Sequence, residues 1–333
     1  MLHSRLRPLP RRNAVPSAPS APTPEFENED LQVDESPEDL FGTFLPHLFP
    51  DDAPSFHGDP GQHLLYSSPR YGDLDIMVPS YPSSGNRSEE IAAGQPKADG
   101  TVNQVDEGRK LFAHFLWSAA MVVAEGVEMA DEPGSEGTEA RDIWAVEGES
   151  VLELGAGAAL PSVICALAKA SNVAATDHPS SPALSGAITH NIEHNLPQTV
   201  KGAVSMYPHE WGVLDDAFST QNKGSFSRIV AADCFWMRSQ HENLARTMQW
   251  FLSPGGKVWV VAGFHTGRAI VAGFFETALE NGFVIERIFE RDLVERLEDG
   301  GEIRRDWVPF REGEGVENQK RWCVVAVLKR KEE

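Results

Sequence analysis

The sequence is poor in cysteine and has no long apolar run. Its three cysteines (Cys165, Cys234 and Cys323) lie far apart, without a Cys-x-x-Cys pair. This argues against a disulfide framework or a thiolate zinc site and favours a reducing intracellular compartment. No apolar run is long enough to span a membrane, and the N-terminus lacks the continuous apolar segment of a secretory signal. We therefore expect neither a membrane partner nor secretion.

Basic residues are also scarce, since 29 Lys and Arg stand against 50 Asp and Glu, for a formal net charge of −21. Such a surface repels phosphate backbones, so we expect no nucleic acid as a partner. A basic protein or a cationic small molecule suits this charge better. The plainer alternative is that the charge only keeps the protein soluble.

The N-terminal hundred residues have a composition that is not typical of a folded domain. Residues 1–24 are rich in Arg and Pro and hold no acid, and an acidic run follows over 25–39. This start partly resembles a mitochondrial transit peptide, but its prolines oppose the amphipathic helix of such a peptide. We expect a disordered tail over 1–40, an irregular arm over 41–104 that packs partly on the body, and a cytoplasmic or nuclear location.

The rest of the chain, residues 105–331, reads as one α/β domain. Apolar residues at helical spacing predict a helix over 106–130. We expect a Rossmann-like, seven-stranded, mostly parallel sheet with an antiparallel last strand and helices on both faces. The last two strands are joined by a charged segment, and should pair as a hairpin-like edge. The expected strands are 150–154, 172–176, 202–207, 228–232, 256–263, 283–290 and 321–329, and the helices are 159–170, 181–195, 238–252 and 268–281.

The most informative motif is Val-Leu-Glu-Leu-Gly-Ala-Gly-Ala-Ala-Leu-Pro over residues 151–161. Gly155 and Gly157 permit a tight turn, because glycine accepts positive φ, and the following helix points free N–H groups at a ligand. Leu160 occupies the third position of the dinucleotide pattern, where that pattern needs glycine. Glu153 precedes the turn, and Asp177 ends the next strand, where a carboxylate can bind ribose hydroxyls. The turn therefore predicts a site for a nucleoside without a pyrophosphate.

Together these features resemble the seven-strand, adenosylmethionine-dependent methyltransferases. The resemblance narrows to the family 16 protein methyltransferases, in the branch named after nicotinamide N-methyltransferase, which includes an elongation-factor N-terminal and lysine methyltransferase. It covers about residues 105–330 and is carried by the 151–161 motif and by Phe-Leu-Trp-Ser-Ala (115–119), Ala-Thr-Asp-His-Pro (175–179), His-Glu-Trp-Gly (209–212) and Asp-Cys-Phe-Trp (233–236). Ala159 departs from the family's usual glycine, which could tighten the loop.

The resemblance implies S-adenosyl-L-methionine as cofactor and assigns the residues that hold it. Glu153, Gly155 and Gly157 would line its methionine end and Asp177 its ribose. Trp211 would flank the adenine, Ala232 would help to close the pocket, and Trp117 would cover it. Core packing is the plainer alternative for both tryptophans, since a large aromatic side chain buries much area anywhere.

The methyl acceptor should enter beside Asp233, Trp236 and His265, beyond the carboxyl ends of the strands. An amine must be neutral to attack a methyl group, so Asp233 would orient it or take its proton. Aromatic side chains such as Trp236 would hold a cationic nitrogen, with His265 as a second wall. The alternative for Asp233 is a cap on the following helix.

One motif is typical of a different class of enzyme. His190-Asn191-Ile192-Glu193-His194 has the His-x-x-Glu-His pattern of inverted zinc peptidases, and two histidines at i and i+4 can bind zinc. The sequence offers no convincing third ligand, so we expect a solvated helix face and no metal.

Three functions follow. The first is methyl transfer to a protein lysine or N-terminal amine, with a translation factor as one candidate substrate. The second is methylation of a small, nicotinamide-like amine. The third is a non-catalytic subunit that keeps the fold and uses residues 1–100 to assemble a regulatory complex.

Overall fold

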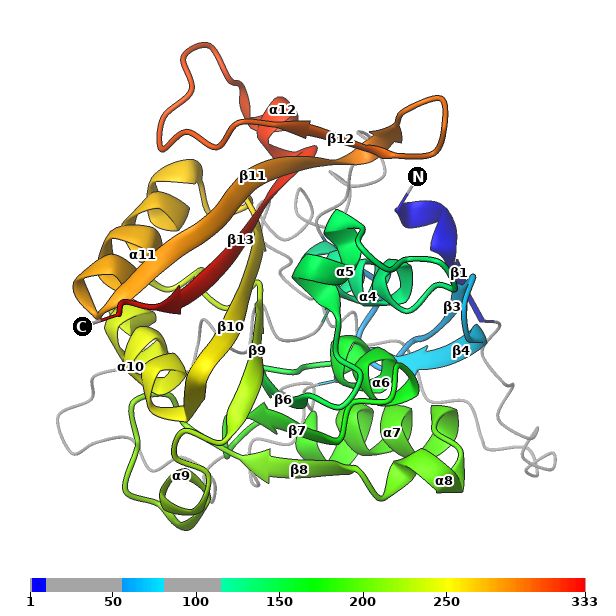
Figure 1. Cartoon of the computed structure of the whole chain (residues 1–333). Helices are drawn as coiled ribbons and strands as arrows, with labels where there is room; N and C mark the ends of the chain where they lie inside the picture. Colours follow the sequence, from blue (N-terminus) through cyan, green and yellow to red (C-terminus); the bar gives the residue numbers. More distant parts are fainter. Residues whose placement is uncertain (1, 10–55, 81–114, 333) are drawn as a thin grey trace, which may run out of the picture.

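A computed structural model describes residues 2–9, 56–80 and 115–332 of the chain. Its largest sheet has eight strands in the order β12-β11-β13-β10-β9-β6-β7-β8 (Figure 1). The strands are β6 (Ser150–Leu154), β7 (Asn172–Asp177), β8 (Val204–Pro208), β9 (Phe226–Ala232), β10 (Leu252–Gly263), β11 (Phe283–Arg296), β12 (Glu302–Arg305) and β13 (Trp322–Arg330). Strands β8, β7, β6, β9 and β10 are parallel, and β13 is antiparallel to both β10 and β11. The predicted α/β fold and its antiparallel last strand are therefore confirmed.

The sheet differs from the expectation at its C-terminal edge. The last two predicted strands do pair, but β13 inserts between β10 and β11, and the additional strand β12 forms the edge. β12 lies in the charged segment where we expected no element. Ion pairs hold it, from Arg291 to Glu302 at 2.9 Å and from Arg305 to Glu290 at 2.6 Å. A strand held by charges lacks the apolar alternation from which strands are predicted.

Helices cover both faces of the sheet (Figure 1). Val151 and Val230 belong to a core shared with α4 to α7, and their neighbours Leu152 and Ile229 to a core shared with α9 to α11. Successive residues of a strand point to opposite faces, which is why adjacent apolar residues fill two cores. The helices are α4 (Ser118–Ala130), α5 (Glu139–Trp144), α6 (Leu160–Leu167), α7 (Thr189–Asn195), α8 (Gln198–Lys201), α9 (Ala217–Gln221), α10 (His241–Phe251), α11 (Arg268–Glu280) and α12 (Val316–Lys320), with a π-helical turn η2 (Leu184–Ile188) before α7 and a 3-10 turn η3 (Arg238–Gln240) before α10.

A second, three-stranded sheet forms from the N-terminal part of the chain. β3 (His63–Ser68) and β4 (Gly72–Met77) make an antiparallel hairpin, and β1 (Leu6–Pro8), which follows the short 3-10 turn η1 (His3–Arg5), pairs with β3. This corrects the expectation of a disordered tail for residues 2–9 and of an irregular arm for 56–80. The strands are short and flanked by Pro and Gly, but Leu64, Tyr66, Leu74 and Ile76 alternate inward and are buried. The remaining tail and arm residues lie outside the described parts.

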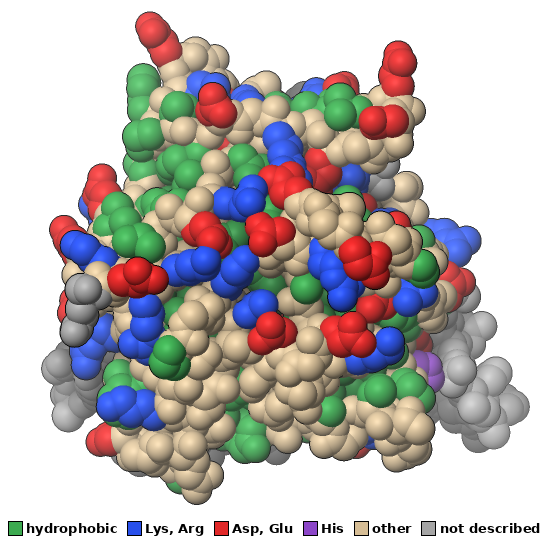
Figure 2. Space-filling model, viewed as in Figure 1, with side chains coloured by type: hydrophobic (Ala, Val, Ile, Leu, Met, Phe, Trp, Pro, Cys, Tyr) green, Lys and Arg blue, Asp and Glu red, His purple; other side chains and the backbone are tan. Residues whose placement is uncertain are grey.

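The predicted helix over 106–130 is shorter in the structure, where α4 starts at Ser118. Before it, β5 (Leu116–Trp117) is extended and pairs with β2 (Phe56–His57), and residues 106–114 lie outside the described parts. No helix among the described residues is long and apolar enough to cross a membrane. On the face seen in Figure 2, basic and acidic side chains are interspersed, so the negative net charge does not gather there as a patch of one sign.

Candidate active site

The glycine turn lies at the carboxyl end of β6, between β9 and β7, where the order of the parallel strands reverses. Ligands of open α/β sheets bind at this position. Gly155 and Gly157 have φ of 63° and 53°, and Ala159 is also left-handed at 53°. A left-handed alanine costs roughly 1–2 kcal/mol, which is the physical effect of the departure noted in the sequence. The loop backbone at Gly155 is exposed and therefore accessible to a ligand.

Two carboxylates from neighbouring strands fix this loop. Glu153 is buried and accepts hydrogen bonds from the backbone N–H of Ser162, at 2.9 Å, and from the Ser162 hydroxyl, which ties β6 to the first turn of α6. Burial raises the pKa of Glu153 to about 8 from its ordinary value of 4.5. Asp177 accepts from the backbone N–H of Gly157 at 2.9 Å and of His178 at 2.7 Å. Both predicted cofactor-binding acids thus also hold the loop in shape.

Trp211 lies directly against the turn. A β-carbon built on Gly155 would lie 3.2 Å from its ring and 3.2 Å from the sulfur of Cys234, so a glycine is required there for two reasons, space and positive φ. The half-buried indole follows β8, and the segment is held by a hydrogen bond from the His209 N–H to the Asp177 carbonyl at 2.8 Å. The structure therefore places Trp211 beside the predicted cofactor loop.

Asp233 follows the last residue of β9, Ala232, and is buried with a left-handed φ of 53°. Its carboxylate accepts from the backbone N–H of Gly263, the last residue of β10, at 3.0 Å. The carboxylate thus ties the end of β9 to the end of β10. Burial raises the pKa of Asp233, and the nearby His265 opposes this.

His265 joins Asp233 to Trp117. Its Nδ1 lies 3.8 Å from the Asp233 carboxylate, and its ring stacks on the indole of Trp117 with centroids 4.5 Å apart and an interplanar angle of 28°. We call these three residues the aromatic–carboxylate wall. His265 follows the end of β10, Asp233 follows the end of β9, and Trp117 lies on β5. Three predicted site residues therefore converge. The fourth, Trp236, lies half-buried in the segment between β9 and η3.

The structure adds neighbours that the sequence did not reveal. Phe56 of β2 pairs with Trp117, with ring centroids 5.7 Å apart, and the ring of His57 lies 2.9 Å from the Ser118 hydroxyl. Pro79 is the nearest side chain to the β-carbon position of Gly157, at 4.0 Å. These residues belong to the N-terminal segment that we expected to be irregular, where no local pattern marks them.

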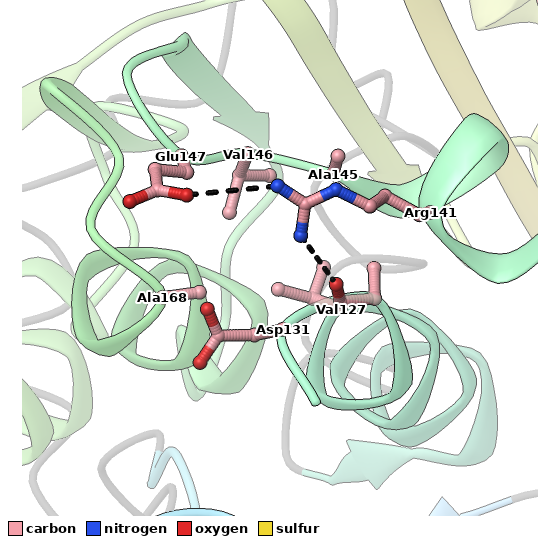
Figure 3. Close-up of a pocket in the computed structure, with 8 residues that line it drawn as sticks. Val127, Asp131, Arg141, Ala145, Val146, Glu147 and Ala168 are labelled. Atoms are coloured by element: carbon pink, nitrogen blue, oxygen red, sulfur yellow. Dashed lines mark hydrogen bonds and ion pairs between the residues drawn. The ribbon is translucent and has the colours of Figure 1, made fainter. Parts of the chain in front are cut away.

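A small depression elsewhere, between α4, α5 and α6, is a poor candidate for the active site. Its volume of about 10 Å³ is roughly that needed by one water molecule. Figure 3 shows Arg141 reaching across it toward Glu147 at 3.7 Å, and its guanidinium donates to the Ala130 carbonyl at 3.2 Å. The cationic group is therefore already used in joining α5 to α4.

The chain is similar to known proteins over a large part of its length. The sequence profile of a family described as lysine methyltransferase matches residues 97–281. A Candida glabrata protein named protein N-terminal and lysine N-methyltransferase EFM7 is 29% identical over 201 residues, which cover 58% of this chain and 73% of that protein. Its Debaryomyces hansenii namesake is 32% identical over 198 residues, covering 55% and 69%. Among solved structures, a TehB-like SAM-dependent methyltransferase from Corynebacterium glutamicum matches with a TM-score of 0.39 and 16% identity, covering 74% of this chain and 96% of that one.

Proposed function

Because the chain belongs to the lysine methyltransferase family, we propose that it transfers a methyl group from S-adenosyl-L-methionine to a protein amine, on a lysine side chain or an N-terminus. The names of its relatives include both acceptors. The observation that carries the proposal is the aromatic–carboxylate wall of Trp117, Asp233 and His265 next to the exposed glycine turn. A translation factor as substrate and a cytoplasmic or nuclear location belong to the same proposal. A regulatory complex through the N-terminal arm belongs to the non-catalytic alternative.

The residues around the turn fit this cofactor. The missing β-carbon of Gly155 leaves space beside the Trp211 indole, and Asp177 ends β7, where a carboxylate can bind ribose hydroxyls. The buried Glu153 holds the loop in shape. Glu153, Gly155, Gly157, Asp177, Trp211 and Ala232 would hold it, with Trp117 covering the pocket. When bound, the cofactor supplies an electrophilic methyl group.

The wall would act on the acceptor amine. Asp233 is only 2% exposed, so it positions His265, whose side chain is 13% exposed and can contact an acceptor. The ring of His265, which faces that carboxylate through Nδ1, would orient the acceptor amine or take the proton that the amine must lose. The faces of Trp117 and Trp236 are suited to hold the cationic nitrogen before that proton leaves.

Labelled cofactor separates the candidate functions. We would incubate the full chain with methyl-labelled S-adenosylmethionine and a cell extract, before and after small molecules are removed. We expect label in protein in both samples, and hydrolysis of the labelled protein should yield methyl-lysine or an N-methylated terminal residue. Label found only in low-mass products would establish the small-amine alternative. No binding of the cofactor in calorimetry would leave only the non-catalytic alternative.

A further inference from the structure

Two histidines and an aspartate meet on the side of the molecule where the β3–β4 hairpin contacts α7. Nδ1 of His63, on β3, lies 2.7 Å from the carboxylate of Asp75, on β4. The ring of His190, on α7, stands at 88° to that of His63 with centroids 4.9 Å apart. One donor atom from each residue lies within 4.8 Å of the other two, and all three side chains are half-buried and so within reach of solvent.

These residues supply what the His-x-x-Glu-His motif lacked. The sequence offers two histidines of α7 and no third ligand near them, whereas the fold brings His63 and Asp75 from the hairpin against His190. His194, one turn further along α7, stacks on His190 with centroids 5.3 Å apart and lies 3.9 Å from the Asp75 carboxylate. The expectation of a solvated helix face therefore has to be revised.

We infer that His63, Asp75 and His190 form a binding site for a divalent transition-metal ion, with zinc as the best-suited metal. Two imidazoles and one carboxylate are a typical zinc donor set, whereas calcium and magnesium prefer oxygen ligands alone. With bonds of about 2.1 Å, tetrahedral zinc holds its ligand atoms roughly 3.4 Å apart. On binding, the 2.7 Å pair of His63 and Asp75 therefore has to open, and donor pairs that lie farther apart, up to 4.8 Å, have to close. Rotation of the half-buried side chains allows both.

Docking of the hairpin does not by itself explain the histidines. Asn191 and Asn195 already fasten β4 to α7, because each side-chain amide exchanges hydrogen bonds with the backbone of one β4 residue. Asn191 accepts from the Met77 N–H at 2.7 Å and donates to its carbonyl at 3.0 Å. Asn195 does the same at Asp75, at 2.9 Å and 2.8 Å. Moreover, among the described residues, the buried Nε2 of His190 has no hydrogen-bond partner, as expected of a ligand atom without its ion.

The test is zinc binding by the full chain without an affinity tag, after chelation and dialysis. When zinc sulfate is added back, we expect one zinc ion per chain by elemental analysis, and saturable binding in calorimetry against a competing chelator. His63→Ala and His190→Ala should each weaken the affinity by more than the roughly 10- to 100-fold that loss of a second-shell group costs. Glu193→Gln is the matched control, because Glu193 lies on the same helix, is exposed, and should leave zinc affinity unchanged.

Two further measurements separate loss of a metal ligand from loss of folding. Asp75→Asn retains the size and hydrogen-bonding capacity of Asp75, and should still lower zinc affinity because the carboxylate is lost. Unchanged circular dichroism and S-adenosylmethionine binding would show that each variant is folded. Equal zinc affinity in the wild type and in both histidine variants would overturn the assignment, as would the absence of zinc binding at micromolar concentrations by folded wild-type protein.

Discussion

The two sides of the candidate active site are built in different ways. The glycine turn after β6 is made of consecutive residues, and its shape is fixed by carboxylates that bind its own backbone, Glu153 at Ser162 and Asp177 at Gly157. The aromatic–carboxylate wall is made of single side chains from three distant segments, at Trp117, Asp233 and His265. A turn of the first kind suits a ligand shared by many enzymes, whereas a wall of the second kind can differ from one acceptor to the next.

The largest effect is expected at the wall. His265→Ala should lower the rate of methyl transfer to protein by roughly 100-fold or more, because a positioned general base contributes about that much. The affinity for S-adenosylmethionine should fall far less, since the turn is untouched and only the covering Trp117 loses its stacking partner. Single-turnover labelling and calorimetry on the same preparations measure the two quantities. A parallel fall in cofactor affinity would mean that the two sides are not separate.

A smaller effect is expected at the turn, where two glycines can be compared. Gly155→Ala and Gly157→Ala carry similar left-handed strain, of roughly 1–2 kcal/mol. Only the first also places a β-carbon 3.2 Å from Trp211 and Cys234, whereas at Gly157 the nearest side-chain atom is Pro79's, at 4.0 Å. We expect Gly155→Ala to weaken cofactor binding by about tenfold more than Gly157→Ala, an additional ~1.4 kcal/mol. Equal losses by calorimetry would show that the indole does not border the ligand.

The last prediction concerns stability and not activity or binding, and is a pH dependence at the turn. The pKa of Glu153 is about 8 in the folded chain against an ordinary 4.5, so between these values the folded state binds the extra proton. Its contribution is complete below pH 4.5 and is lost as the pH rises toward 8, by at most about 1.4 kcal/mol per pH unit. Glu153→Gln should therefore flatten the fall in unfolding free energy between pH 6 and 8, measured by urea denaturation. An unchanged slope would contradict the assigned pKa.

The same contrast explains which parts of the fold and of the site could be predicted from the sequence. β6 has the predicted bounds, and the turn after it could be located because strand, glycines and helix are contiguous. The hairpin of β3 and β4 and the edge strand β12 were missed, since neither short strands next to Pro and Gly nor strands held by ion pairs show a clear apolar pattern. The contact of Asp233 with His265 and the third ligand for His190 depend on tertiary structure, which no local spacing encodes.

The Asn191 side chain has a mechanical consequence. Besides holding Met77, its amide nitrogen donates to the carbonyl of Ala158, inside the glycine turn, at 2.7 Å. A single side chain of α7 therefore holds both the N-terminal hairpin and the turn. A force that lifts the hairpin from α7 pulls on the same amide that holds the turn, although strand and turn are more than seventy residues apart in the sequence.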